Sequence, residues 1–183
     1  MQEAAEFAAR YGPWALIAGG SEGIGRSFAL QLAARGLHLI LVARREEPLQ
    51  ATAQEIRERF DVQVSVHSED LTAPDLGPRI EKVVAGREVG MLIYNAGAVH
   101  GAGLLLDRAL DDALTLVRLN CVGPLTLIHS LGARMRERRR GGIILMSSMS
   151  AFGGVGYTAA YAATKAFERV LAEGLWWEFG TFG

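Results

Sequence analysis

The fold is decided by the stretch WALIAGGSEGIG, which runs from Trp14 to Gly25. A short apolar run, typical of a buried strand, leads directly into a glycine-rich turn, and a helix is expected from Arg26 until Gly36 stops it. Glycine lets the backbone turn sharply, lets a pyrophosphate approach and lets the helix pack closely on the strand. The helix start offers free N–H groups and a positive dipole end to phosphate oxygens. The position of the turn therefore predicts a nucleotide site, although a glycine cluster alone would fit any tight turn.

The rest of the chain repeats this order of a short apolar run followed by a longer helical pattern. Strands are expected at 14–18, 37–42, 62–66, 91–94 and 143–146, and helices at 26–35, 46–60, 76–85, 111–138 and 157–178. Strands that are apolar throughout suit a parallel sheet covered on both faces. Repeated strand–helix–strand units predict a doubly wound α/β sheet, the Rossmann fold. Because the 183 residues contain no repeat or linker, residues 1–183 are expected to form one domain.

Composition and charge argue against several classes of protein. Hydrophobic residues make up 50% of the chain, and the net charge is −1, so no general field attracts nucleic acid or an anionic membrane. No apolar run reaches the roughly 20 residues that span a bilayer, and the first residues lack the pattern of a signal peptide. With one cysteine, Cys121, no internal disulfide can form, and a cytoplasmic protein is expected. No metal site is expected, because four histidines share no ligand spacing: His38, His67, His100 and His129.

The residues after the second expected strand indicate which dinucleotide is bound. In doubly wound folds an acid at this point binds the ribose 2′-hydroxyl of NAD, whereas an arginine pairs with the 2′-phosphate of NADP. Here the strand is followed by Arg44 and Arg45, with no acid until Glu46. We expect Arg44 to bind the 2′-phosphate and Arg45 to assist, so that NADP(H) is preferred over NAD(H). The alternative is a solvated basic turn that leads into the next helix.

A candidate catalytic pair lies on the last helix, where Tyr161 and Lys165 have the i, i+4 spacing of one helix face. Carbonyl reduction requires a proton donor for the developing alkoxide, and the reverse reaction requires a base. A phenol ordinarily ionises near pH 10, and a nearby cation favours the phenolate. This spacing alone also fits an ordinary helix surface, but Ser148 at the end of the fifth expected strand adds a hydroxyl upstream.

Taken in order, these motifs resemble the short-chain dehydrogenase/reductase family of classical type. The glycine turn has the family's spacing Gly-x-x-x-Gly-x-Gly, although Ala18 stands where the family usually has threonine. The resemblance implies that Lys165 also binds the nicotinamide ribose, that Ser148 rather than Ser147 bonds the substrate oxygen, and that Asn120 anchors a proton-relay water. It adds cofactor contacts at the turn and at the ends of the third and fourth strands: Gly19, Ser21, Gly23, Ile24, Gly25, Asp70, Leu71, Asn95, Ala96 and Gly97, with Asp70 facing the adenine amino group.

The resemblance implies an oxidoreductase that transfers hydride between NADP(H) and a small-molecule carbonyl or secondary alcohol. It also implies a homodimer or homotetramer, and residues 11–15 (YGPWA) are similar to the hydroxysteroid and 3-ketoacyl reductase subgroup. Family members add further strands after the last helix, so the sheet is expected to lack the usual C-terminal strands. That expectation leaves a second hypothesis, an NADP-binding module or inactive subunit without turnover, which NADPH oxidation against ketones would distinguish.

Overall fold

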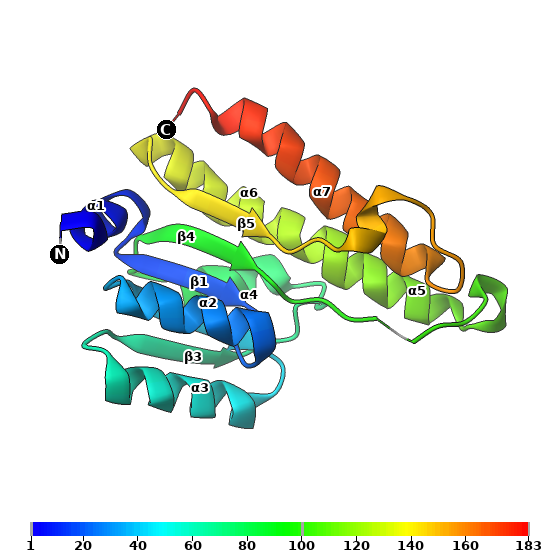
Figure 1. Cartoon of the computed structure of the whole chain (residues 1–183), viewed down its shortest axis with the longest axis horizontal. Coiled ribbons are helices and arrows are strands. Elements are labelled where there is room, and N and C mark those ends of the chain that lie inside the picture. Colours follow the sequence, from blue (N-terminus) through cyan, green and yellow to red (C-terminus); the bar gives the residue numbers. More distant parts are fainter. Residues whose placement is uncertain (1, 100, 183) are drawn as a thin grey trace.

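The computed structural model describes residues 2–99 and 101–182 and contains a parallel sheet with helices on both faces (Figure 1). The five strands lie in the order β3-β2-β1-β4-β5, and every neighbouring pair is parallel. Their bounds are β1 Trp14–Ala18, β2 His38–Ala43, β3 Val64–Ser68, β4 Val89–Tyr94 and β5 Gly142–Leu145. The chain thus has the predicted doubly wound α/β fold, and the carboxyl ends of all strands lie at one edge of the sheet, to the right in Figure 1.

Each face of the sheet has its own apolar core, which explains why the strands are apolar throughout. On β1, Leu16 and Ala18 face one cluster while Ala15 and Ile17 face the other, and all four are completely buried. The first cluster packs under α4 (Leu76–Val83), α6 (Gly123–Arg138) and α7 (Ala159–Phe179), and the second under α2 (Gly23–Ala34) and α3 (Glu46–Arg59). Successive side chains of a strand point to opposite faces, so every position of a doubly covered strand must be apolar.

The structure differs from the sequence expectation at several element ends. The helix α1 (Gln2–Tyr11) was not predicted, and β3 starts at Val64 because Val62 still belongs to the connection after α3. The last helix begins at Ala159 rather than at Tyr157, whose φ of 65° lies in the left-handed region that helices exclude. Two 3-10 turns, η1 (Leu105–Asp107) and η3 (Met149–Phe152), lie beside the carboxyl edge.

The helix expected at 111–138 is interrupted by a π-helical segment. It consists of α5 (Leu110–Val117), the π segment η2 (Arg118–Val122) and α6. The amide of Gly123 donates to the carbonyl of Arg118 five residues earlier, which releases the Leu119 carbonyl from the helix ladder. The buried Tyr94 hydroxyl, from the end of β4, donates to that carbonyl at 2.6 Å. A side chain at Gly123 would lie 2.2 Å from the Tyr94 hydroxyl, so only glycine fits beside it.

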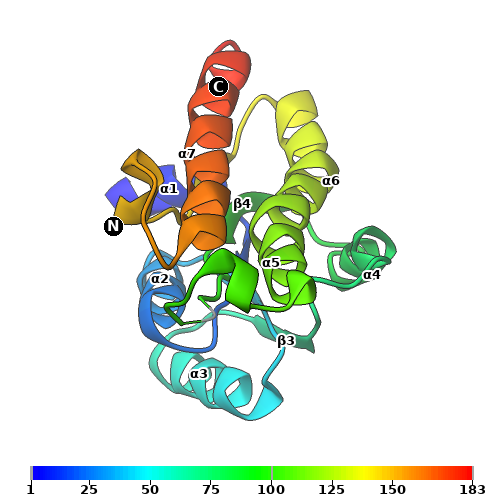
Figure 2. The same cartoon turned by 90° about the vertical axis from the view of Figure 1, so that its right-hand side faces the viewer.

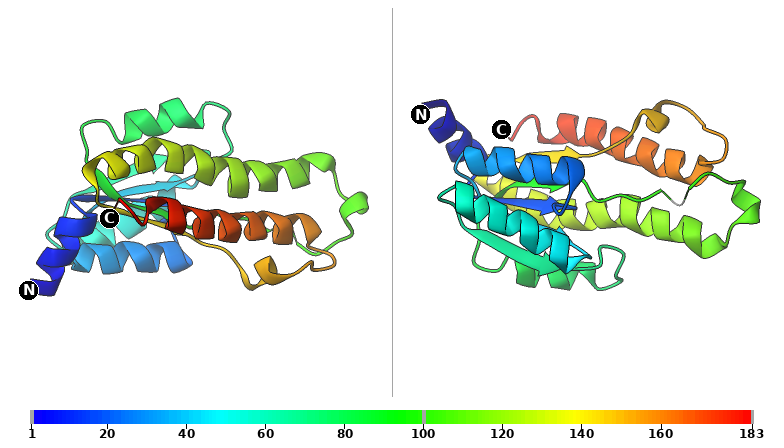
Figure 3. Two further views of the ribbon diagram at one scale, coloured as in Figure 1. Left: turned by 90° about the horizontal axis from the view of Figure 1, so that it is seen from above. Right: turned by 60° about the horizontal axis from the view of Figure 1, so that its bottom comes forward.

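The continuous helical stretch Leu110–Arg138 is long and apolar enough to cross a membrane by length and composition alone. In this structure its buried residues Leu127, Ile128 and Leu131 pack into the first core cluster. The stretch runs beside α7, which contacts α5 (Figures 2 and 3). Core helices of globular domains have the same length and hydropathy, so this feature is weak evidence for a membrane span.

We predict that Tyr94→Phe lowers the free energy of unfolding by about 1–3 kcal/mol, because it leaves the partly buried Leu119 carbonyl without its donor. Urea denaturation followed by circular dichroism measures this loss. Tyr157→Phe is the matched control, since its ring is 63% exposed. Equal stability of the two variants would show that the hydroxyl does not hold the π segment.

Candidate active site at the carboxyl edge of the sheet

The glycine turn after β1 requires glycine at each of its three motif positions, for different reasons. Gly19 has a φ of 82°, and a side chain there would lie 2.7 Å from the backbone nitrogen of Ala96. A side chain at Gly25 would lie 1.9 Å from the carbonyl oxygen of Gly19. Gly23 opens α2 with a φ of 54° in open space, so its need is conformational. The turn is therefore folded back on itself and against the end of β4.

The Asn95–Gly97 segment joins this turn to the centre of the site. The amides of Asn95 and Ala96 both donate to the carbonyl of Ala18 at 2.9 Å, and the Asn95 Nδ2 donates to the carbonyl of Gly19 at 3.1 Å. Gly97 follows at the far side, where an added Cβ would lie 3.2 Å from the Nζ of Lys165. The expected cofactor segment and the expected catalytic lysine are thus direct neighbours.

The first turn of α2 leaves its amides open to an anion. The residue before it, Glu22, makes no side-chain cap, and the turn Gly23–Arg26 contains no acidic residue. Ile24 is 57% exposed in this turn, while the Ser21 carbonyl accepts a hydrogen bond from Thr52 at 2.8 Å. Free amides at a helix start bind phosphate oxygens. These features fit the pyrophosphate of a dinucleotide.

The basic residues after β2 have different partners. Arg45 forms an ion pair with Glu22 of the glycine turn, and both side chains are more than half exposed. Arg44 lies near Asp70, whose pKa is lowered chiefly by a hydrogen bond from the Thr72 amide and further by the charge of Arg44. The structure thus brings Arg44 and Asp70 together at the ends of β2 and β3, whereas Arg45 is engaged in its ion pair with Glu22. The sequence-predicted Leu71 instead buries its side chain in the first core cluster.

The two serines after β5 have different hydrogen bonds. Ser147 donates to the backbone carbonyl of Lys165 at 2.7 Å, so it fastens the loop to α7. The Ser148 Oγ accepts from the amide of Ser150 at 3.3 Å and from its hydroxyl at 3.0 Å. A hydroxyl that accepts two hydrogen bonds still has its own proton to donate. Ser148 therefore has the chemistry required to bond a substrate oxygen, whereas the Ser147 proton is already engaged.

Asn120 connects the π segment to the helix that carries the candidate catalytic pair. Its Nδ2 donates to the Thr164 hydroxyl at 2.9 Å, and that hydroxyl donates to the Tyr161 carbonyl at 2.8 Å. Asn120 is completely buried, and within the described residues its Oδ1 has no hydrogen-bond partner. The Oδ1 of Asn120 is thus left to accept from another group.

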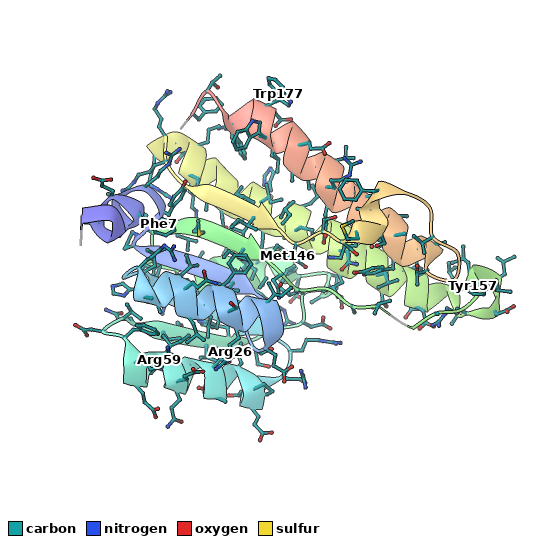
Figure 4. All side chains as sticks on the ribbon, in the orientation of Figure 1. Phe7, Arg26, Arg59, Met146, Tyr157 and Trp177 are labelled. Atoms are coloured by element: carbon teal, nitrogen blue, oxygen red, sulfur yellow. The ribbon has the colours of Figure 1, made fainter. Side chains whose placement is uncertain are left out.

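Lys165 is buried and makes two strong contacts. Its Nζ donates to the carbonyl of Met146 at 2.7 Å, just beyond the end of β5 (Figure 4), and to the Oε2 of Glu168 at 2.8 Å. The sequence analysis missed Glu168, whose side chain is completely buried. Burial raises the pKa of Glu168 to about 7, although the adjacent lysine opposes that rise. The signal available in the sequence was the position of Glu168 three residues after Lys165, a spacing that puts both side chains on one helix face.

The structure has two hollows of interest, of which only the smaller is lined by a candidate site residue. Tyr161 is half-buried and lines a small one of about 30 Å³, together with Val99, Leu116 and Tyr157. A larger one of about 470 Å³ runs along the free edge of β5 and is lined by aromatic residues of the C-terminal segment: Trp176, Phe179 and Phe182. Across residues 2–99 and 101–182 no group of acidic, histidine and cysteine side chains could hold a metal ion, and His100 lies outside these residues.

Comparisons with known proteins agree with this geometry. A family model described as short chain dehydrogenase matches residues 13–183. The chain is 34% identical over 177 residues to a very-long-chain 3-oxoacyl-CoA reductase of Laccaria bicolor, which covers 93% of this chain and 51% of that protein. It is 29% identical over 181 residues to the inactive hydroxysteroid dehydrogenase-like protein 1 of Homo sapiens, at 98% and 55% coverage. The chain spans about half the length of the curated relatives it matches.

A solved structure gives a similar result. The short-chain dehydrogenase from Sphingobium yanoikuyae in complex with NADPH matches with a TM-score of 0.87 and 32% sequence identity. The match covers 93% of this chain and 67% of that one.

We predict that Gly25→Ala weakens NADPH binding about tenfold or more, because the new methyl group would collide with the Gly19 carbonyl and open the turn. Isothermal titration calorimetry measures the affinity, with circular dichroism to check the fold. Gly174→Ala is the control, since a side chain at that position of α7 meets nothing within 4 Å. Unchanged affinity in Gly25→Ala would contradict a phosphate-binding role for the turn.

Proposed function

The chain belongs to the short-chain dehydrogenase family, and on that premise we propose that it is an NADP(H)-dependent oxidoreductase acting on a carbonyl compound or secondary alcohol. One observation carries the proposal. The buried ammonium of Lys165 lies beside Gly97, whose segment is hydrogen-bonded to the glycine turn. A cofactor laid along that turn would therefore reach the residues that can move a proton.

NADP(H) fits the residues at the carboxyl edge. The free amides at the start of α2 would hold the pyrophosphate. Because Gly19 and Gly25 have no side chains, the turn is tight and its backbone can approach the pyrophosphate closely. The remaining donor of the Lys165 ammonium would bind a ribose hydroxyl, because its other contacts take only two of three protons. When bound, the cofactor supplies the hydride for reduction or accepts it in the reverse direction.

The residues of this chain would supply the proton. Tyr161 would donate it to the alkoxide that develops from the carbonyl, and Ser148 would hold the same oxygen with its free hydroxyl proton. Lys165 favours the phenolate that remains after the transfer. The unpaired Oδ1 of Asn120 would accept from a water that returns a proton to the site.

A preference for NADP(H) over NAD(H) is part of the proposal. Arg44 is exposed just after the end of β2, and its side chain would bind the adenosine 2′-phosphate, while Asp70 nearby would face the adenine amino group. Arg45 is paired with Glu22, so its charge is largely offset and its contribution is smaller than that of Arg44. The Sphingobium relative with NADPH bound supports the same choice.

We also propose a homodimer or homotetramer that forms through α5, α6 and α7, and a cytoplasmic location. These helices expose large apolar side chains to solvent: Leu114, Val117, Leu125, Val170, Trp176 and Trp177. Exposed large apolar side chains on neighbouring helices are typical of contacts between subunits. The cytoplasmic location is supported by the presence of one unpaired cysteine, Cys121.

A second candidate is a cofactor-binding protein without turnover. The relative named as an inactive hydroxysteroid dehydrogenase-like protein favours it. Against it stands the full set of Asn120, Ser148, Tyr161 and Lys165, which a binding module does not require.

We predict that Tyr161→Phe lowers NADPH-dependent reduction of ketones about 10²- to 10⁴-fold without loss of NADPH affinity, because the phenol is the proton donor. NADPH absorbance against a panel of ketones measures the rates. Tyr157→Phe, on the exposed turn before α7, is the control and should keep the activity. If the unmodified protein and Tyr161→Phe are equally inactive while both bind NADPH, the second candidate is correct.

We predict that Arg44→Ala weakens NADPH binding about tenfold or more and leaves NADH binding unchanged, because only NADPH carries the 2′-phosphate. Arg45→Ala is the comparison and should cost less, since Glu22 already engages that side chain. Titrations of both cofactors into both variants measure the four affinities. Equal losses for NADPH and NADH in Arg44→Ala would rule out a specific phosphate contact.

A further inference from the structure

Arg108 is an arginine that the proposed mechanism does not use. In residues 2–99 and 101–182 the guanidinium groups of the other arginines, apart from Arg44, contact an acid, a backbone carbonyl or an aromatic ring. Arg44 is the proposed contact of the 2′-phosphate. In the same residues the guanidinium of Arg108 has no such contact, although it carries a permanent charge and five N–H donors. Arg108 is therefore a cation whose ligand the proposed function does not supply.

The side chain of Arg108 lies where two loops of the candidate active site meet. Arg108 directly follows η1, in the connection between β4 and α5, and its guanidinium lies against Gly103 of the same connection. A Cβ at Gly103 would lie 2.8 Å from the Nε of Arg108 and 3.0 Å from its Nη2, so a side chain there would displace the guanidinium. The Gly103 amide donates to the backbone carbonyl of Tyr157 at 2.9 Å, in the loop before α7 (Figure 4). The absence of a side chain at Gly103 thus lets the cation lie at this junction.

Arg108 lines the small hollow that Tyr161 also lines. Two apolar side chains of its wall, Val99 and Leu105, are 55% and 52% exposed. The hollow holds only about 30 Å³, so a ligand would lie largely over these exposed apolar groups. Asp112 lines the hollow as well, but no ion pair joins it to Arg108 in the part of the chain that the structure describes. The hollow therefore combines an unpaired cation, an apolar surface and the candidate proton donor.

We propose that Arg108 is a specificity-determining residue that binds a carboxylate of the substrate, so that the substrate is an oxo acid with an apolar chain between its carboxylate and its ketone. A planar guanidinium donates two parallel hydrogen bonds to a carboxylate, and such charge-assisted pairs are stronger than bonds between neutral groups. The exposed apolar side chains favour a hydrocarbon chain beside them. The ketone would then meet the Tyr161 phenol of the same hollow. The inference rests on the proposed function for the reaction, whereas binding of the carboxylate requires no turnover.

The test compares straight-chain oxo acids of increasing length, each with its ketone next to the terminal methyl group, with the methyl esters of the same acids. The ester lacks the negative charge, so the ratio of the kcat/KM values of acid and ester with NADPH reports recognition of the carboxylate. We expect the unmodified protein to prefer the acid. Arg108→Leu should lower the ratio about ten- to a hundredfold, because a hydrogen bond between charged groups is lost. Asp112→Asn should raise the ratio, because it removes a negative charge from the hollow.

Arg118→Leu is the matched control and should keep the ratio of the unmodified protein. Its ion pair with Asp111 is solvent-exposed, and its side chain does not line the hollow. A purely structural role of Arg108 would lower the reduction of acid and ester alike. An unchanged ratio in Arg108→Leu therefore overturns the proposal, as does an equal fall in Arg118→Leu. If Arg108→Leu does not fold, Arg108→Gln removes the charge but keeps a polar side chain and supplies the same comparison.

Calorimetry separates this proposal from the proposed function. Titration of the oxo acids into the protein with NADPH measures binding without turnover, and Arg108→Leu should weaken that binding about tenfold or more. An acid that binds through Arg108 but is not reduced would refute the proposed function and leave the role of Arg108 standing. If ketones are reduced without preference for the acid, or if Arg108→Leu does not weaken binding of the acid, the role of Arg108 is refuted and the proposed function stands.

Discussion

A buried ammonium must be paired, and the way Lys165 satisfies this requirement organises the site. The ammonium has three protons to donate, and their hydrogen-bond acceptors must lie at the carboxyl edge of the sheet. The Met146 carbonyl comes from the end of β5, and the Glu168 carboxylate comes from the next turn of α7. The first contact holds the loop that carries Ser148 close to α7, and the Ser147 hydroxyl bonds the Lys165 carbonyl from the same loop. The cation thus fixes the relative positions of a strand end, a loop and a helix.

The π segment helps to position Tyr161 and Lys165 on α7 through the hydrogen bonds of Asn120. Because the Tyr94 hydroxyl occupies the Leu119 carbonyl, the helix gains one residue at this point and Asn120 is turned inward, fully buried. Asn120 then reaches Thr164, the residue before Lys165, and Thr164 reaches the Tyr161 carbonyl. A local break in one helix therefore positions the side chains of another. Two sequence features permit this break in the helix: Gly123 has no side chain to collide with Tyr94, and Pro124 has no amide proton.

The sequence was informative where local chemistry dictates structure. Continuous apolar runs predict strands covered on both faces, and Gly19 and Gly25 predict close backbone approach, because both requirements act within a few residues. Contacts between residues that are distant in the sequence could not be predicted from these local patterns. The ion pair of Glu22 with Arg45 depends on how two turns meet in space. Lys165 and Glu168 are three residues apart on one helix, but the burial of their pair depends on how α7 packs over the sheet. The start of β3 at Val64 also depends on pairing, since its register is set by Leu39 of β2 rather than by its own alternation.

Two acids, Glu22 and Glu168, each form an ion pair with a basic residue of the candidate site, but the strength of the two interactions differs. Glu22 and Arg45 are more than half exposed, so water and salt screen their interaction and little binding energy depends on it. Glu168 and Lys165 have almost no exposed surface, and there the removal of one charge changes the field on every neighbour. The exposed acid therefore contributes little to the field at the glycine turn, whereas the buried acid sets the charge around Lys165. Burial, more than the number of charges, decides which carboxylate influences the chemistry.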